Sequence, residues 1–203
     1  MITLIIVIVT CIVSITAFQR RDLFEKLLLS PYRVANNKEW YRMITHGFLH
    51  GDYIHLAVNM IVLYSFGEAL QDLFSSYSAY GAIHFALLYF GALIVASFST
   101  VIKYKDSYSY ASIGASGAVS AVLFAFVFIN PWSKLHFMGI LPIPGIIFGP
   151  LYLWYSSYMA KRGGDNVNHD AHFYGAVFGF IYPVLVNPYL LQHFIRQLVT
   201  FGK

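Results

Sequence analysis

Mostly apolar residues occur in long blocks separated by more polar stretches. Six such blocks lie at about 2–18, 54–70, 79–102, 115–130, 137–160 and 172–187. A helix that crosses a bilayer needs about 20 mostly apolar residues. The pattern therefore predicts an all-α fold, a polytopic membrane protein built as a bundle of six transmembrane helices.

The polar stretches predict how these helices are joined. Residues 19–53 mix leucine and phenylalanine with arginine, lysine and glutamate, which is typical of short helices lying at a membrane interface. Asn130-Pro131 ends the fourth block, since proline disfavours helix in the residue before it. Prolines 142, 144 and 150 predict an irregular start to the fifth block. Residues 161–171 form a polar loop, and 188–203 a weakly amphipathic helix.

Composition supports the membrane assignment. The chain is 58% hydrophobic and 11% charged, against about 25% charged in soluble domains. The first block has no basic segment before it and no small-residue cleavage site, so we expect a retained helix. With 203 residues, we expect a single membrane-embedded domain over 1–203. The net charge of +4 is spread over loops, and no basic patch indicates nucleic acid. The single cysteine, Cys11, excludes a disulfide within the chain.

Basic residues are unequally divided between the two sides. The loops after the first, third and fifth blocks hold ten of the 13 lysines and arginines. The positive-inside rule would place this side in the cytoplasm and the N-terminus outside.

Polar residues gather where the second, fourth and sixth blocks begin, all on that ten-charge side. They are His50, His55 and Asn59, then Ser116, and then His172. Polar groups at membrane depth are costly and by default mark function. We therefore expect these side chains to meet in one layer of the bundle.

Ser116 is the candidate nucleophile. A lone serine in a membrane helix usually bonds a neighbouring carbonyl or helps helices to associate. Here Gly114 and Gly117 flank it at a helix start, which allows a tight turn and close approach. The free N–H groups of such a helix start can receive an oxyanion.

His172 is the candidate base, because a serine hydroxyl needs an adjacent proton acceptor to become a good nucleophile. Gly175 and Gly179 lie on the same helix face as His172, so this helix can approach the fourth one closely. His169 is a competing base; we place it in the loop, without a matching glycine face.

The second block begins with a group of hydrogen-bond donors. Asp52 is a suitable N-cap, and His55 and Asn59 share a helix face. Imidazole and amide N–H groups can stabilise an oxyanion. We assign that role to His50, Asn59 and the Ser116 backbone, and a structural role to His55.

A metal site is the rival chemistry, since the chain has eight histidines. However, no HExxH motif occurs, and no carboxylate within an apolar block pairs with these histidines. We therefore expect no metal and no cofactor.

Together these residues resemble the rhomboid family of intramembrane serine proteases, in its small six-span bacterial type. The resemblance runs from about 38 to 180. It rests on H-x-x-x-x-H-x-x-x-N at His50, His55 and Asn59, on G-x-S-G at Gly114, and on A-H-x-x-G-x-x-x-G at Ala171. It implies a Ser116–His172 dyad without a third acid, with oxyanion donors from His50, Asn59 and the Ser116 N–H.

The resemblance further implies that residues 19–53 are the family's long first loop. Substrates would be single-span membrane proteins, cleaved in or near their transmembrane helix, and the location would be a bacterial cell membrane. Membrane lipid is the other partner; the oligomeric state is open. A catalytically inactive relative that binds transmembrane helices is the alternative, and a small transporter or metal-handling protein a more distant one.

Three positions depart from the family pattern. The family's Trp-Arg pair in the first loop is Tyr41-Arg42 here, and we expect Arg42 to support that loop. An aromatic residue often follows the serine by four positions and contacts the histidine; here that position is Ser120. The glutamate expected near the end of the second helix is Glu68 or is replaced by Gln71. The charge distribution also disagrees with bacterial members, whose N-terminus is cytoplasmic.

Overall fold

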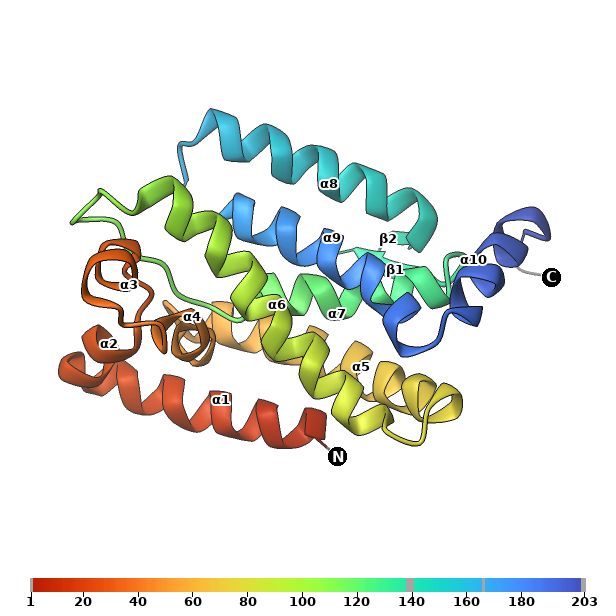
Figure 1. Cartoon of the computed structure of the whole chain (residues 1–203), viewed down its shortest axis with the longest axis horizontal. Coiled ribbons are helices and arrows are strands. Elements are labelled where there is room, and N and C mark those ends of the chain that lie inside the picture. Colours follow the sequence, from red (N-terminus) through yellow and green to blue (C-terminus); the bar gives the residue numbers. More distant parts are fainter. Residues whose placement is uncertain (1, 138–140, 166, 202–203) are drawn as a thin grey trace.

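Helices make up most of the computed structural model, which describes residues 2–137, 141–165 and 167–201 (Figure 1). Each predicted block contains one long helix. These are α1 (Ile2–Gln19), α5 (Tyr53–Tyr77), α6 (Gly81–Tyr104), α7 (Ser116–Ile129), α8 (Gly145–Arg162) and α9 (His169–Val186). The predicted all-α class is confirmed.

Judged by length and hydropathy alone, fewer than six of the described helices could cross a membrane. Among the described residues, α1, α5 and α6 are long and apolar enough to cross a membrane. A fourth span results if α9 and α10 (Tyr189–Val199), which meet at a bend of 115°, are taken together. The helix α7 is apolar but has only 14 residues. These apolar helices indicate that the chain is an integral membrane protein. The number of six spans remains a prediction.

The first loop folds into short helices, as predicted. They are α2 (Arg21–Leu27), α3 (Pro31–Asn37), α4 (Arg42–Thr45) and the 3-10 turn η1 (His46–Phe48). Ser30 caps α3, and Pro31 occupies its first position, where proline's missing N–H costs nothing. The loop is therefore an ordered part of the fold.

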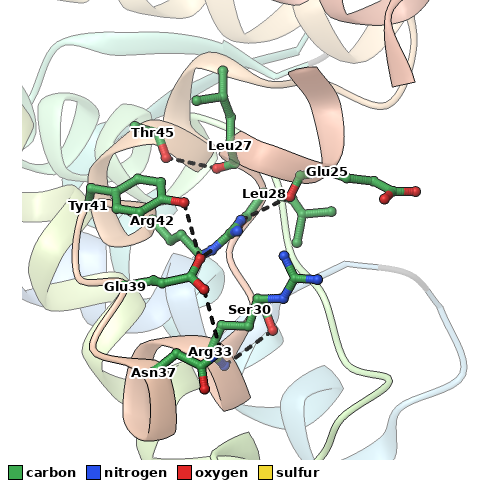
Figure 2. Close-up of polar contacts among 10 residues, drawn as sticks. All are labelled: Glu25, Leu27, Leu28, Ser30, Arg33, Asn37, Glu39, Tyr41, Arg42 and Thr45. Carbon is green, nitrogen blue, oxygen red and sulfur yellow. Dashed lines mark hydrogen bonds and ion pairs between the residues drawn. The ribbon is translucent and has the colours of Figure 1, made fainter. Parts of the chain in front are cut away.

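Arg42 holds this loop together (Figure 2). Its side chain is only 2% exposed; its Nε donates to Glu39 Oε2 at 2.6 Å, and its Nη1 donates to the carbonyl oxygens of Glu25 and Leu28. Burial alone would raise the pKa of Glu39, but hydrogen bonds from Arg42 and Tyr41 and the charge of Arg42 bring it below 4.5. One guanidinium thus joins α2 to α4, which agrees with the expected supporting role.

The start of the fifth block is a strand pair rather than helix, which confirms the predicted irregular start and shortens the helix predicted within 137–160. Strand β1 (Lys134–Phe137) pairs antiparallel with β2 (Leu141–Pro144), with Lys134 opposite Pro144. Helix α8 begins only at Gly145. The two prolines of β2 have no N–H for a helical hydrogen bond, which favours an extended segment.

The helices run alternately in opposite directions. Helices α1, α6 and α8 end at the left of Figure 1, where α5 and α9 begin and from which the chain enters α7. Helix α7 lies in the centre of the bundle, with Ala118, Ala121 and Ala125 completely buried. The starts of α5, α7 and α9 are thereby brought to the same side, which positions the polar residues described next.

Candidate active site

Ser116 is the first residue of α7 and follows a strained turn. Gly114 has φ +113°, a conformation that residues with a side chain rarely adopt, and its N–H donates to the carbonyl oxygen of His46. Ala115 occupies the cap position and has no side-chain oxygen to accept from the helix start. The first N–H groups of α7 therefore lack a cap beside the Ser116 hydroxyl.

His172 lies within hydrogen-bonding distance of Ser116. Its Nε2 is 2.7 Å from the Ser116 Oγ, so the hydroxyl can donate its proton to the imidazole. A side chain at Gly175 would collide with the carbonyl oxygen of Gly117, and one at Gly179 with that of Ala121. The absence of side chains at these positions permits the close approach of α9 and α7 that places His172 on Ser116.

His169 is not in the loop as expected but is the first residue of α9. Asn168 caps the helix by accepting from the Ala171 N–H, and this starts the helix before the predicted residue 172. The His169 Nε2 pairs with Asp165 Oδ2 at 3.0 Å, and this hydrogen bond holds the pKa of the Asp165 carboxyl below its usual range. His169 is thus engaged with Asp165, whereas His172 is the histidine on Ser116.

The two remaining histidines occupy different positions relative to Ser116. The His55 ring lies beside Gly114, in the turn that precedes Ser116. A Cβ atom added to Gly114 would lie 3.0 Å from His55 Cε1. Asn59, one turn further along α5, donates one amide hydrogen to the His55 carbonyl oxygen at 2.9 Å. His50 is completely buried, and its ring meets the His55 ring edge to face at 4.8 Å.

Hydrogen bonding defines which nitrogen of His50 carries a proton. The Ser14 hydroxyl donates to the Phe48 carbonyl oxygen at 2.7 Å, so its oxygen accepts from His50 Nδ1 at 3.0 Å. Burial lowers the pKa of His50 to about 3, which keeps the ring neutral with one N–H. That N–H points at α1, and Nε2 meets no polar partner among the described residues.

A cavity of about 1350 Å³ opens at this point. Ser116, His172, His55 and Asn59 line it together with Tyr152 and Asn168. His50 is not part of the lining. Since hydrolysis needs water, a cavity that reaches the paired serine and histidine supplies a necessary condition for it.

Two residues at this site were not predicted from the sequence. Tyr152 of α8 faces His172, and Ser14 of α1 holds His50. Both lie far along the chain from their partners, and tyrosine and serine are common in this sequence. The sequence carries no signal that marks either of them.

The structure is thus that of a membrane protein in which a serine hydrogen-bonded to a histidine lies in a cavity between apolar helices. Comparison with known proteins gives the family. Residues 37–189 match the model of the Rhomboid domain, and the chain belongs to the rhomboid family.

Three relatives illustrate the similarity. The mitochondrial Rhomboid protein 1 of Saccharomyces cerevisiae is 29% identical over 168 residues, covering 79% of this chain and 46% of that protein. Rhomboid protease GluP of Bacillus subtilis is 28% identical over 142 residues, 70% of this chain and 25% of GluP. The mitochondrial presenilin-associated rhomboid-like protein A of Danio rerio is 30% identical over 184 residues, 86% of this chain and 44% of that protein. The chain thus spans less than half the length of these three relatives.

Proposed function

We propose that this protein is an intramembrane serine endopeptidase that cleaves single-span membrane proteins in or near their transmembrane helix. The observation that carries the proposal is the 2.7 Å contact between His172 Nε2 and Ser116 Oγ on the wall of a large cavity. Membership of a family that includes a named protease supports it.

The reaction proceeds in two halves. The Ser116 Oγ attacks the carbonyl carbon of the scissile bond while its proton passes to His172 Nε2. The C–N bond then breaks, and His172 returns the proton to the leaving amine. In the second half a water attacks the acyl-serine, giving its proton to His172 and releasing the carboxylic acid. The proton finally returns to Ser116.

The oxyanion donors in this proposal are His55, Asn59 and the Ser116 backbone N–H. His55 replaces His50 in the role expected from the sequence. The reason is geometric: His55 and Asn59 line the cavity, whereas the only N–H of neutral His50 is directed to Ser14. His50 takes the structural role, supporting the His55 ring from behind.

Residues 1–203 form one functional domain in the same proposal. The first helix, outside the family match, contributes Ser14 to the support of His50. We also propose a bacterial cell membrane as the location, which the similarity to GluP of Bacillus subtilis supports; the other two relatives named above are mitochondrial. Immunogold labelling or membrane fractionation of the source cells tests this location.

A fluorophosphonate probe tests the activity. We expect labelling of the detergent-purified wild type and none of Ser116→Ala or His172→Ala, because an unactivated serine reacts too slowly. Cleavage of a single-span substrate must disappear in the same two variants. Labelling that persists in Ser116→Ala would remove the assignment. A folded wild type that neither labels nor cleaves would instead favour the non-catalytic protein that binds transmembrane helices.

A further inference from the structure

Tyr152 of α8 faces the His172 ring, which the His169 ring also meets, edge to face at 5.9 Å. The Tyr152 and His172 rings are nearly parallel, at 24°, with centroids 6.5 Å apart, an offset arrangement within the usual range for aromatic pairs. Helix α8 follows α7 in the chain and lies on the outer side of α9 in Figure 1. The ring therefore reaches the imidazole from a helix that carries neither Ser116 nor His172.

The Tyr152 side chain is itself fixed on several sides. Its hydroxyl lies 2.6 Å from the Ser120 Oγ, a short hydrogen bond to α7. Phe124 of α7 meets the ring at 5.4 Å and Phe148, one turn earlier on α8, at 5.6 Å. A ring with a bonded hydroxyl and two aromatic neighbours has few alternative orientations, so it offers a fixed surface to His172.

Ser120 lies one helical turn after Ser116 on the same helix. The small serine at this position leaves space beside the imidazole, and the space is occupied from α8 by the Tyr152 ring. Both residues also line the cavity that contains Ser116 and His172. The contact thus belongs to the environment of the dyad and not to the distant core.

We propose that Tyr152 is a positioning residue for the dyad: its ring fixes the His172 imidazole against Ser116, and Ser120 fixes Tyr152 through its hydroxyl. The Tyr152 ring need not touch the reacting atoms. It limits rotation of the imidazole, which must keep Nε2 directed at Oγ for proton transfer. The kinetic part of this inference rests on the proposed function.

Two substitutions distinguish the effect of the Tyr152 ring from that of its hydroxyl. Tyr152→Leu removes the aromatic surface, and we expect kcat for substrate cleavage to fall about tenfold or more with little change in KM. Tyr152→Phe keeps the ring and should restore kcat to within about threefold of wild type. Tyr158→Leu is the matched control, because Tyr158 lies on the same helix, is half exposed and stacks on Trp154. The inference is wrong if Tyr152→Leu and Tyr158→Leu have the same kcat.

The hydrogen bond between Ser120 and Tyr152 can be tested by combining substitutions at the two residues. Ser120→Ala leaves a tyrosine hydroxyl without its partner, and we expect a smaller loss of kcat than in Tyr152→Leu. Once Tyr152→Phe has removed that hydroxyl, adding Ser120→Ala should cost little more. Strictly additive effects of the two changes would show that the hydrogen bond does not hold the ring.

A chemical measurement keeps the inference testable without protease activity. Diethyl pyrocarbonate modifies imidazoles, and mass spectrometry can follow His172 against His84 at the start of α6 as an internal reference. Tyr152→Leu uncovers one face of the His172 ring and should speed its modification about threefold, whereas Tyr152→Phe should not. Unchanged reactivity in a folded Tyr152→Leu would overturn the positioning role. Faster modification in a protein that never cleaves substrate would overturn only the proposed function.

Discussion

Single residues decide which histidine can take part in the proposed reaction. The spacing of His50, His55 and Asn59 predicted a group of donors near Ser116, and the cavity does contain two of them. We now propose for His55 the oxyanion role that the sequence predicted for His50, because the His50 ring is directed at Ser14, 36 residues away. Ser116 and His172 could be predicted to lie together, because glycines flank Ser116 and two further glycines share a helix face with His172. No such local sign marks the direction of an imidazole.

Substituting the two histidines separately tests their roles. His55→Ala should lower kcat about 10²-fold, because it removes a donor from the oxyanion. His50→Ala removes an imidazole that is fully buried and lies outside the cavity lining. Its main effect should be a lower melting temperature, with a smaller loss of kcat than in His55→Ala. Enzyme kinetics and thermal unfolding in detergent measure both. A larger loss of kcat in His50→Ala than in His55→Ala would restore the original assignment.

At the scale of elements, α7 and α9 form the frame of the site. Glycine spacing on the sixth block predicted their close approach, and the side chains that would collide at Gly175 and Gly179 explain why it needs glycine. The strand pair β1–β2 was not predicted, because β2 lies inside the hydrophobic block, where its prolines indicated only an irregular start. Helix α5 also extends to Tyr77, beyond the predicted end at residue 70, where Gln71 Oε1 accepts from the first N–H groups of α1. A pairing of this kind between distant segments is not visible in a local pattern.

A methyl group added between the two helices should separate them. Gly179→Ala would place its Cβ against the Ala121 backbone, which cannot move like a flexible side chain, and should cost about 1–3 kcal/mol of stability. Activity should fall with it, because His172 moves away from Ser116. Gly149→Ala on α8 is the control, since its Cβ would meet Phe124 at an ordinary 3.6 Å. Equal melting temperatures for the two variants would contradict the role of the glycine contact.

On the scale of the whole molecule, the alternation of helix directions is what assembles the site. It was predictable, because blocks of apolar sequence alternate across a bilayer and so bring every second start to one side. The number of spans is harder to predict, since α7 has only 14 residues and α8 is less apolar, ending in Lys161 and Arg162. Arg42 holds the first loop together through contacts with Glu25, Leu28 and Glu39. The backbone pairing of Leu29 with Ser112 joins the loop to the segment before α7.

The Glu39–Arg42 pair should make stability depend on pH. The folded pKa of Glu39 lies below its ordinary value of 4.5, so the pair contributes fully above about pH 4.5. Its contribution is lost as the pH falls through the lowered folded value. Glu39→Gln should therefore lower the melting temperature at pH 7, and the difference from wild type should narrow in acid. Glu25→Gln, which breaks an exposed pair with Arg21, should change little at either pH.

The cavity beside Ser116 also has a consequence for the solvent. A volume of about 1350 Å³ holds on the order of tens of water molecules. An acyl-serine formed there would meet water at close to its bulk concentration, without any crossing of lipid. We therefore expect cleavage to respond to osmotic pressure. Polymers too large to enter the cavity should draw water from it, whereas small solutes should leave its hydration intact.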